Sequence, residues 1–368
     1  MTIRFNPRLI LKRTQFRALS CIHLQSFLLK MIVNKNNENA WLDMRDALYD
    51  GSFFRWLERQ NFDTKKLEKM RMNIHHYDLI YEMLESIFSI IFETIPPEVN
   101  QFLKEKKDEE IKVNSFDELV IGKNLVLTLN QNPKVLLEMV WIAPGTFDMG
   151  RDDTESYDDE KPIHKVNITK GYWIGKYQLT QGQWKVVVNE NSERNRKNHI
   201  KGDYYPAENV SWSESDAFCA KLNDKFRDII KDYYFNLPTE AQWEFAAREG
   251  EKSRDKYQYS GSDILDEVGW FIENSRGESH EVGLKKPNAR GIYDMSGNIF
   301  EWCRDWYDYY SEFEVDDPVG PNNGKGRVFR GGSWGNSARY CRISDRRYDE
   351  PSARGLNLGF RVALVPVQ

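Results

Sequence analysis

The sequence has little of what usually carries metal or phosphate chemistry. It contains 4 cysteines and 6 histidines among 368 residues. No two cysteines are spaced as Cys-x-x-Cys, so a zinc site is not indicated. No glycine-rich segment ends in Gly-Lys-Ser or Gly-Lys-Thr, which excludes a phosphate-binding loop of the P-loop type. The net charge is −5, and without a basic excess we expect no nucleic-acid partner.

The sequence also lacks long apolar runs. No stretch approaches the roughly 20 apolar residues that a membrane-spanning helix needs, so we expect no membrane span. Residues 18–29 follow basic residues and are partly apolar, but His23, Gln25 and Ser26 interrupt them, and no small-residue cleavage site follows. Four cysteines are too few for a disulfide-dense secreted scaffold. Together these observations predict a cytoplasmic protein.

What is present divides into two parts of different composition. Residues 1–133 are poor in glycine and tryptophan, whereas residues 134–368 hold most of both. Apolar residues in the first part recur at helical spacing, most clearly at Ile80, Leu84, Ile87, Phe88 and Ile91. We expect a small α-helical domain at 1–133 and a second domain at 134–368, separated by a turn-forming cluster. The apolar strand expected at 124–129 fits either side of this boundary.

The predicted helical domain shows no chemistry of its own. His75 and His76 are adjacent, and adjacent residues on a helix point in different directions, so they do not predict a metal site. Four apolar residues follow a Gly-Ser break, namely Phe53, Phe54, Trp56 and Leu57. They fit either the core of this domain or a docking surface. We expect residues 1–133 to contact a protein partner.

Short strands and capped helices are predicted in the second domain. Strands are expected at residues 136–142, 162–168 and 358–364. Three helices are expected to begin at residues whose side chains suit the N-cap position, namely Thr180, Ser211 or Ser213, and Thr239. The total of 11 tryptophans predicts a core that is filled by aromatic rings rather than by long sheets.

An ordered series of motifs runs through the second domain, at residues 139–150, 172–180, 210–219, 237–248, 287–295, 297–302 and 330–334. The last one reads Arg-Gly-Gly-Ser-Trp. In this order the motifs resemble the formylglycine-generating enzyme (sulfatase-modifying factor) family over residues 134–368. The resemblance implies an α+β, C-type-lectin-like fold with little regular secondary structure. We expect this fold after the helical N-terminal domain.

The resemblance also implies a reaction. Formylglycine-generating enzymes use oxygen to oxidise a sulfatase cysteine, with copper(I) on two cysteines in the pattern Arg-Gly-Gly-Ser-aromatic-x-Cys-x4-Cys. Here the second cysteine is Cys341, but the first position is Asn336. An amide does not replace a thiolate as a ligand of a soft ion, so we expect no copper centre and a merely packed Cys341. The alternative is an oxygen-dependent oxidase of this type with an altered copper site at Cys341.

Structural calcium is a further implication of the resemblance. Family members bind this ion with oxygen ligands near the motif at 297–302 and near residue 274, and oxygen-rich loops suit Ca²⁺. The corresponding residues here are Asn274, Asn298 and Glu301. We expect calcium at these residues. The alternative is that their side chains only close turns.

The irregular segment after the Arg-Gly-Gly-Ser-Trp motif is the expected ligand-binding surface. It is rich in Tyr, Ser, Gly and Asn, which is typical of adaptable binding loops, and irregular segments on a rigid scaffold often carry function. The residues expected to contact a ligand are Trp334, Asn336, Ser337, Tyr340, Asp345, Arg347, Tyr348, Asp349 and Asn357.

This segment is similar, too, to the variable region of diversity-generating-retroelement proteins, which use the same fold. Asparagine codons are randomised in those proteins, and this process does not yield Lys, Gln, Glu, Met or Trp. Residues 335–358 contain no Lys, Gln, Met or Trp, and Glu350 then has to be an invariant position. We therefore expect a non-catalytic binding protein whose 334–357 surface contacts a protein or other ligand, with diversification as one origin of that surface.

Overall fold

The computed structural model describes residues 9–11, 16–18, 121–131, 133–188, 201–248 and 257–367. The chain divides into two compact units, Met1–Lys112 and Val113–Gln368. In the first unit, β1 (Leu9–Leu11) and β2 (Phe16–Ala18) form an antiparallel pair. The helices, the apolar cluster and the histidine pair predicted within residues 1–133 lie outside the described residues.

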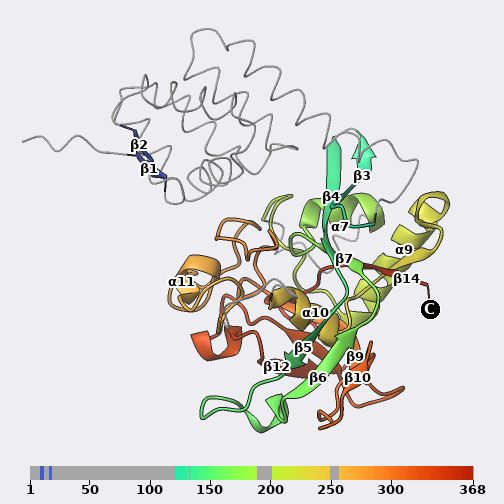
Figure 1. Cartoon of the computed structure of the whole chain (residues 1–368). Helices are drawn as coiled ribbons and strands as arrows, with labels where there is room; N and C mark the ends of the chain where they lie inside the picture. The colour runs from blue at the N-terminus through green and yellow to red at the C-terminus, as the bar shows by residue number, and fades with distance from the viewer. Residues whose placement is uncertain are drawn as a thin grey trace, which may run out of the picture. The chain divides into compact units, whose positions relative to one another are not determined.

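A five-stranded sheet forms the centre of the second unit (Figure 1). Its strands, in spatial order, are β3 (Leu125–Gln131), β4 (Lys134–Ile142), β7 (Tyr172–Gly175), β14 (Ala363–Pro366) and β8 (Tyr233–Asn236). All neighbours are antiparallel. Because β3 pairs with β4, the strand expected at 124–129 belongs to this sheet and thus to the second unit.

Two smaller sheets stand beside the central one. The first contains β12 (Arg346–Asp349), β11 (Arg327–Arg330), β9 (Phe300–Trp306) and β13 (Leu358–Gly359) in this order. The second contains β10 (Val315–Asp316), β6 (His164–Ile168) and β5 (Gly145–Met149). The strand predicted at 358–364 is therefore two strands: β13 pairs with β9, while β14 pairs with β7 and β8.

Three of the described α-helices begin where the sequence predicts, namely α7 (Gln181–Val188), α9 (Trp212–Ile230) and α10 (Glu240–Ala247). A short fourth one, α11 (Leu265–Val268), was not predicted. Short 3₁₀ helices lie at η1 (Asp158–Glu160) and η3 (Ala338–Cys341). The Ser211 and Thr239 side chains each accept a hydrogen bond from the backbone N–H three residues on, and the side chain at that third position bonds back. Thr180 and Gln183 make the same reciprocal pair before α7.

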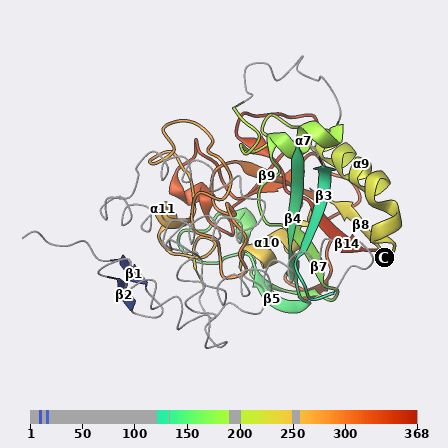
Figure 2. The ribbon, with the colours of Figure 1, turned by 90° about the horizontal axis from the view of Figure 1, so that it is seen from above.

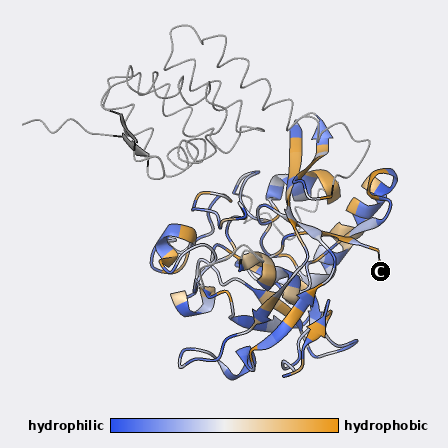
Figure 3. Cartoon of the chain, viewed as in Figure 1, coloured by the Kyte–Doolittle hydropathy of each residue, from blue (hydrophilic) through white to orange (hydrophobic). Residues whose placement is uncertain are grey.

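Aromatic rings are a large part of the core, as predicted, but they pack together with aliphatic residues on a five-stranded sheet rather than taking its place. Trp173, Trp243 and Trp302 are fully buried, and the Trp302 indole N–H donates to the Val210 carbonyl at 2.9 Å. Figure 2 shows α7 and α9 side by side next to β3 and β4. Along β3, buried leucines alternate with partly exposed residues, and Figure 3 shows both apolar and polar residues on the described strands. Within the described residues, no helix combines the length and apolar character that crossing a bilayer requires.

Candidate binding surface and its buried support

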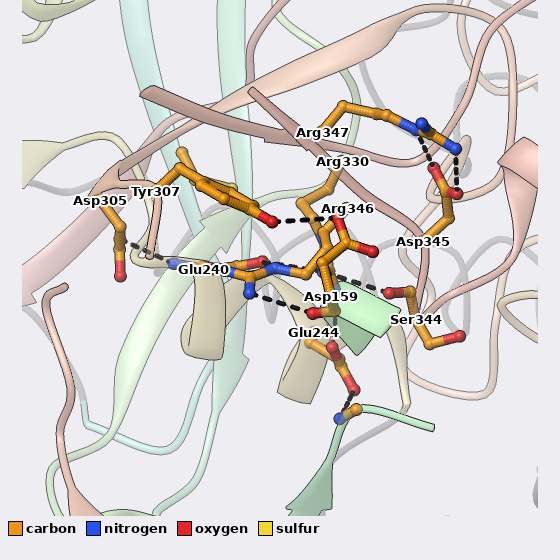
Figure 4. A network of polar contacts seen from close by, with 12 residues as sticks. Asp159, Glu240, Glu244, Asp305, Tyr307, Arg330, Ser344, Asp345, Arg346 and Arg347 are labelled. Atoms are coloured by element: carbon orange, nitrogen blue, oxygen red, sulfur yellow. Dashed lines mark hydrogen bonds and ion pairs between the residues drawn. The ribbon is translucent and has the colours of Figure 1, made fainter. Parts of the chain in front are cut away.

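Buried ion pairs tie α10 to the strands that flank the expected surface (Figure 4). Arg330, which ends β11, is fully buried. Its guanidinium donates to Glu240 at 2.9 Å and also to Glu244, one turn further along α10. Arg346, which begins β12, donates twice to Glu240, at 2.8 and 2.5 Å. Removing one partner of such a pair leaves an uncompensated buried charge at a cost of about 3–5 kcal/mol, so the network fixes β11 and β12 to the helix.

A second buried pair joins the surface segment to the acidic loop at 151–160. The Arg342 guanidinium forms two parallel bonds with the Glu160 carboxylate, at 2.8 and 2.6 Å. Both side chains are buried, and the paired geometry is the strong form of an Arg–carboxylate contact. The loop is consequently held against the segment after residue 334, about 180 residues later in the chain.

Cys341 is packed in the way the sequence suggests. It is fully buried in an apolar cluster with Leu265, Val268 and Phe271. Its sulfur lies 2.5 Å from the position that a Cβ on Gly332 would occupy, and the φ of Gly332 is +74°. Burial and the nearby Asp345 charge raise the pKa of the Cys341 thiol. The site therefore favours a protonated thiol rather than a thiolate.

The Asn336 amide takes part in a local hydrogen-bonded chain. The Ser333 hydroxyl bonds to Asn336 Oδ1, and the Asn357 amide donates to the Ser333 hydroxyl oxygen at 3.0 Å. The Asn336 carbonyl accepts from the Ile272 backbone N–H at 3.0 Å. A neutral amide and a buried, protonated thiol do not fit a copper(I) centre, which requires soft thiolate ligands.

Trp334 connects the two ends of the surface segment. Its indole N–H donates to the Leu356 carbonyl at 3.2 Å. Its backbone N–H donates to the Asn298 carbonyl, and its own carbonyl accepts from the Ser275 hydroxyl, both at 2.8 Å. These contacts hold the half-buried ring beside the hydrogen-bonded chain of Asn336 and Asn357.

A group of stacked tyrosines and arginines forms the second part of the surface. Tyr340 stacks on Tyr157 with ring centroids 6.4 Å apart. The Arg347 guanidinium lies 4.6 Å from the Tyr340 centroid and 4.8 Å from that of Tyr157, and it also pairs with Asp345 at 3.1 Å. Burial raises the pKa of Asp345 to about 6, against the lowering effect of Arg347. Arg339 covers Tyr157 at 4.0 Å.

Sequence reasoning missed Tyr157 and Arg339. Tyr157 comes from the acidic loop, and the only sequence signal for its position was the pair of oppositely charged residues, Glu160 and Arg342, that brings the loop to the segment. Arg339 lies within the segment, but nothing local shows that its guanidinium faces a ring from another loop. Both extend the predicted surface with a cation–π stack.

Alternation along β12 separates Tyr348 from Arg347. Successive strand residues point to opposite faces, and Tyr348 stacks on Tyr307 at 4.0 Å, away from the Tyr157 group. Tyr348 is 50% exposed, and Asp349 and Ser337 are exposed as well. The structure thus places the nine expected residues in three groups: Trp334, Asn336 and Asn357; Ser337, Tyr340, Asp345 and Arg347; Tyr348 and Asp349. The expectation for Asp345 needs correction, because its side chain is fully buried and pairs with Arg347 instead of being exposed to a ligand.

Oxygen atoms converge on one buried amide in front of β9. Gln178 Nε2 lies 3.2 Å from the Asp294 carbonyl, 3.3 Å from that of Gly297, 2.9 Å from that of Ile299 and 3.0 Å from Glu301 Oε1. An amide NH₂ has two hydrogens and so serves two of these four acceptors. Gln178 Oε1 is buried without a partner. The four acceptors and Gln178 Oε1 are hard oxygen donors of the kind that Ca²⁺ takes, and an ion bound by them would replace Nε2 at the point on which the four acceptors converge.

Glu301 is the only one of the three predicted calcium ligands in this cluster, where it also pairs with Arg361 at 2.6 Å. The side chains of the other two make different contacts. Asn298 Oδ1 accepts from the His280 backbone N–H at 2.9 Å, and Asn298 Nδ2 donates to the His280 carbonyl at 3.1 Å. The Asn274 side chain accepts from the Phe271 N–H at 2.8 Å. In this structure these two side chains close turns, and calcium at Asn274 and Asn298 stays a prediction.

Comparison with known proteins agrees with this architecture. Residues 127–365 match the sulfatase-modifying factor enzyme 1-like domain family. The chaperone protein LppX of Paenibacillus barcinonensis is 30% identical over 63% of this chain and 90% of LppX. The formylglycine-generating enzyme of Mus musculus is 28% identical over 64% of this chain and 77% of the enzyme.

A solved structure gives the same result. Treponema denticola variable protein 1 superposes with a TM-score of 0.58 at 32% identity, covering 66% of this chain and 99% of the variable protein. The match to the domain family spans well over half of the sequence. This chain therefore belongs to the sulfatase-modifying factor enzyme 1-like family.

Proposed function

We propose that this protein is a non-catalytic binding module that presents the 334–357 surface to a protein ligand. The observation that carries the proposal is the replacement of a thiolate pair by Asn336, bonded to Ser333, and by Cys341, buried against Gly332. Neither side chain offers a soft, ionised ligand. The frame around them is nevertheless fixed by buried ion pairs, which hold the surface in one shape.

The chemistry of the surface suits a protein ligand. Tyrosine and arginine dominate the energetics of protein interfaces, because they bury large area with few rotatable bonds or form directed hydrogen bonds. Tyr340, Arg347 and the 50% exposed Tyr348 provide such anchors, and Tyr157 and Arg339 enlarge the stack. The anchors are already ordered by stacking, which reduces the entropy cost of binding.

The likeness to Treponema denticola variable protein 1 supports diversification as the origin of this surface. We propose that residues 335–358 are a variable region of the diversity-generating-retroelement type. A near-copy of the 3′ coding end, differing at adenines and next to a reverse transcriptase gene, is the expected genomic context. A single, unrepeated coding end would contradict this proposal without affecting the binding role.

Capture experiments test the assignment of the surface. The variant Tyr340→Ala/Arg347→Lys/Tyr348→Ala should lose its ligand in a pull-down from extracts of the source cells, because a lysine does not replace the stacked, forked guanidinium. Its melting curve should stay close to that of the wild type, since the substituted lysine keeps a positive charge beside the buried Asp345 and the two tyrosines are at least partly exposed. A matched control is Lys225→Ala/Arg227→Ala, because both residues are exposed on α9. Equal capture by the triple variant and the control would refute the surface.

A second candidate function is an oxygen-dependent oxidase, favoured by the 28% identity to the mouse formylglycine-generating enzyme. It requires copper at Cys341, the one cysteine of the expected pair that is present. The buried thiol and the amide at position 336 are inconsistent with this function.

We also propose that residues 1–133 contact a protein partner, and that Gln178, Glu301 and the neighbouring carbonyls hold a structural calcium ion.

A further inference from the structure

A cavity lies next to the buried ion pairs, and none of the nine expected binding residues lines it. Its volume is ≈ 350 Å³, at the lower end of the volumes of ligand pockets. Its walls come from β5, β6, α10, the end of β9 and the loop at 308–321. Its lining is mainly aromatic or aliphatic, and includes Trp306, Tyr309, Tyr310 and Pro321.

One buried carboxylate in this cavity is only half satisfied. Asp305 is 5% exposed and lines the cavity. Its Oδ2 accepts the Glu240 backbone N–H at 2.9 Å (Figure 4), while no residue that the structure describes donates to Oδ1. Oδ1 is not among the fully buried side-chain atoms that lack a partner, so this oxygen is open to the cavity that Asp305 lines. Burial, followed by the charge of Glu240, raises the pKa of Asp305 to about 7.

The other buried charged groups of the cavity are already paired. Arg346 directs Nε and one Nη2 hydrogen to Glu240, and its Nη1 donates to the carbonyls of Asp159 and Asp308 at 3.2 and 2.8 Å. The Arg346 charge is therefore compensated by Glu240, and most of its N–H donors already have acceptors, so it offers little attraction to an anion. The exposed Asp308 at the rim adds negative charge. The site consequently favours a cation.

We propose that this cavity binds a primary ammonium group on an apolar stem, with the Asp305 carboxylate as its counterion. An ammonium group supplies donors for the free Oδ1, and the apolar walls suit a short hydrocarbon chain. Tyr309, which is 72% exposed, gives an aromatic face at the mouth for a cation–π contact. Tyr310 is occupied on its faces by Arg346 and His164, at 3.9 and 4.7 Å, and serves as wall.

Two ligands carry this chemistry, a free alkylamine and the side chain of lysine in a peptide. Saturation-transfer NMR at pH 8 with n-butylamine and with N-acetyl-lysine amide distinguishes them. Tighter binding of the first assigns the site to free amines and tighter binding of the second to peptides, and either result supports the proposal. n-Butanol, which has the same stem without the charge, should not bind.

The variant Asp305→Asn should weaken amine binding by about tenfold or more. Asparagine keeps an oxygen that can accept the Glu240 N–H, so near-UV circular dichroism should be unchanged. Asp228→Asn, an exposed site on α9, is the matched control and should bind like the wild type. Unchanged binding by Asp305→Asn, or binding of n-butanol equal to that of n-butylamine, would overturn the proposal.

The pH dependence of the wild type gives a test that needs no variant. Amine binding should weaken from pH 8 to pH 6, as Asp305 takes up a proton while the amine stays charged. The charged or titratable groups that face Asp305 or share its cavity are Glu240 on α10, Arg346 on β12, Arg304 on β9, Arg327 on β11, His164 on β6, and Asp308, Tyr309 and Tyr310 in the loop. An affinity that is constant between pH 6 and pH 8 contradicts the role of Asp305.

Discussion

Single residues differ in how far the sequence determines them. Ser211 and Thr239 were predictable as helix caps because each signal lies within four residues. The stack of Tyr157 on Tyr340 was not, because no local pattern links two loops that are far apart in the chain. The same holds for Asp305, whose burial depends on a loop that returns after β9. Local signals therefore identified the caps, and only the folded chain shows the partners.

Buried acids predict an unusual dependence of stability on pH. The pKa of Asp305 is raised to about 7 in the folded protein, so the folded state keeps its proton to a higher pH than the unfolded chain does. This carboxyl therefore lowers the free energy of unfolding as the pH rises from about 4 to about 7. In Asp305→Asn, this pH-dependent loss of unfolding free energy, which is on the order of a few kcal/mol, should be absent. Urea titrations of both proteins at pH 5 and pH 8 measure the difference. An equal change in unfolding free energy between the two pH values in both proteins would contradict the prediction.

Gly332 should tolerate no side chain. A Cβ there would lie 2.5 Å from the Cys341 sulfur, at a φ of +74°, so Gly332→Ala should cost roughly 2–5 kcal/mol through overlap and backbone strain. Gly335→Ala is the control, since nothing lies within 4 Å of its Cβ position, and we expect a change below about 0.5 kcal/mol. Thermal unfolding of both variants measures the two changes in stability. Equal stability of the two variants would show that Cys341 is not packed against this turn.

At the scale of elements, local pattern predicts the strands but not the sheets to which they belong. The segment at 358–364 has the composition of one strand, yet β13 pairs with β9 and β14 pairs with β7 and β8. Arg361 lies in the chain between these two strands, and its side chain pairs with the buried Glu301. Such a long-range ion pair leaves no trace in hydrophobic periodicity, so the sequence predicted a single strand.

The loop before β9 should respond to calcium. If the oxygens around Gln178 hold Ca²⁺, adding calcium to chelator-treated protein should stabilise it by about 2–3 kcal/mol at a hundredfold excess over Kd. Gln178→Met should abolish the gain, because a thioether is a poor ligand for a hard cation. Magnesium should not substitute, since it demands a small octahedral site. Scanning calorimetry measures the effect, and identical transitions with and without calcium would argue against the site.

The whole molecule was recognisable because its motifs occur in the family order, and the match over residues 127–365 confirms that identification. Function was less predictable, since one frame supports different sites. The decisive position, Asn336, was visible in the sequence. Its bond to Ser333 and the burial of Cys341 became clear only in the folded chain. The account of a frame that binds and does not oxidise depends on this pair of residues.

Copper content tests that account most directly. The purified protein is loaded with Cu(I) under anaerobic conditions, treated with a Cu(I) chelator to remove loosely held metal, and analysed for copper per chain, alongside Cys341→Ala. We expect sub-stoichiometric copper that is equal in both proteins, because a buried thiol and an amide do not form a soft-metal site. About one copper per chain in the wild type, absent from Cys341→Ala, together with oxidation of a cysteine peptide in air, would contradict the account.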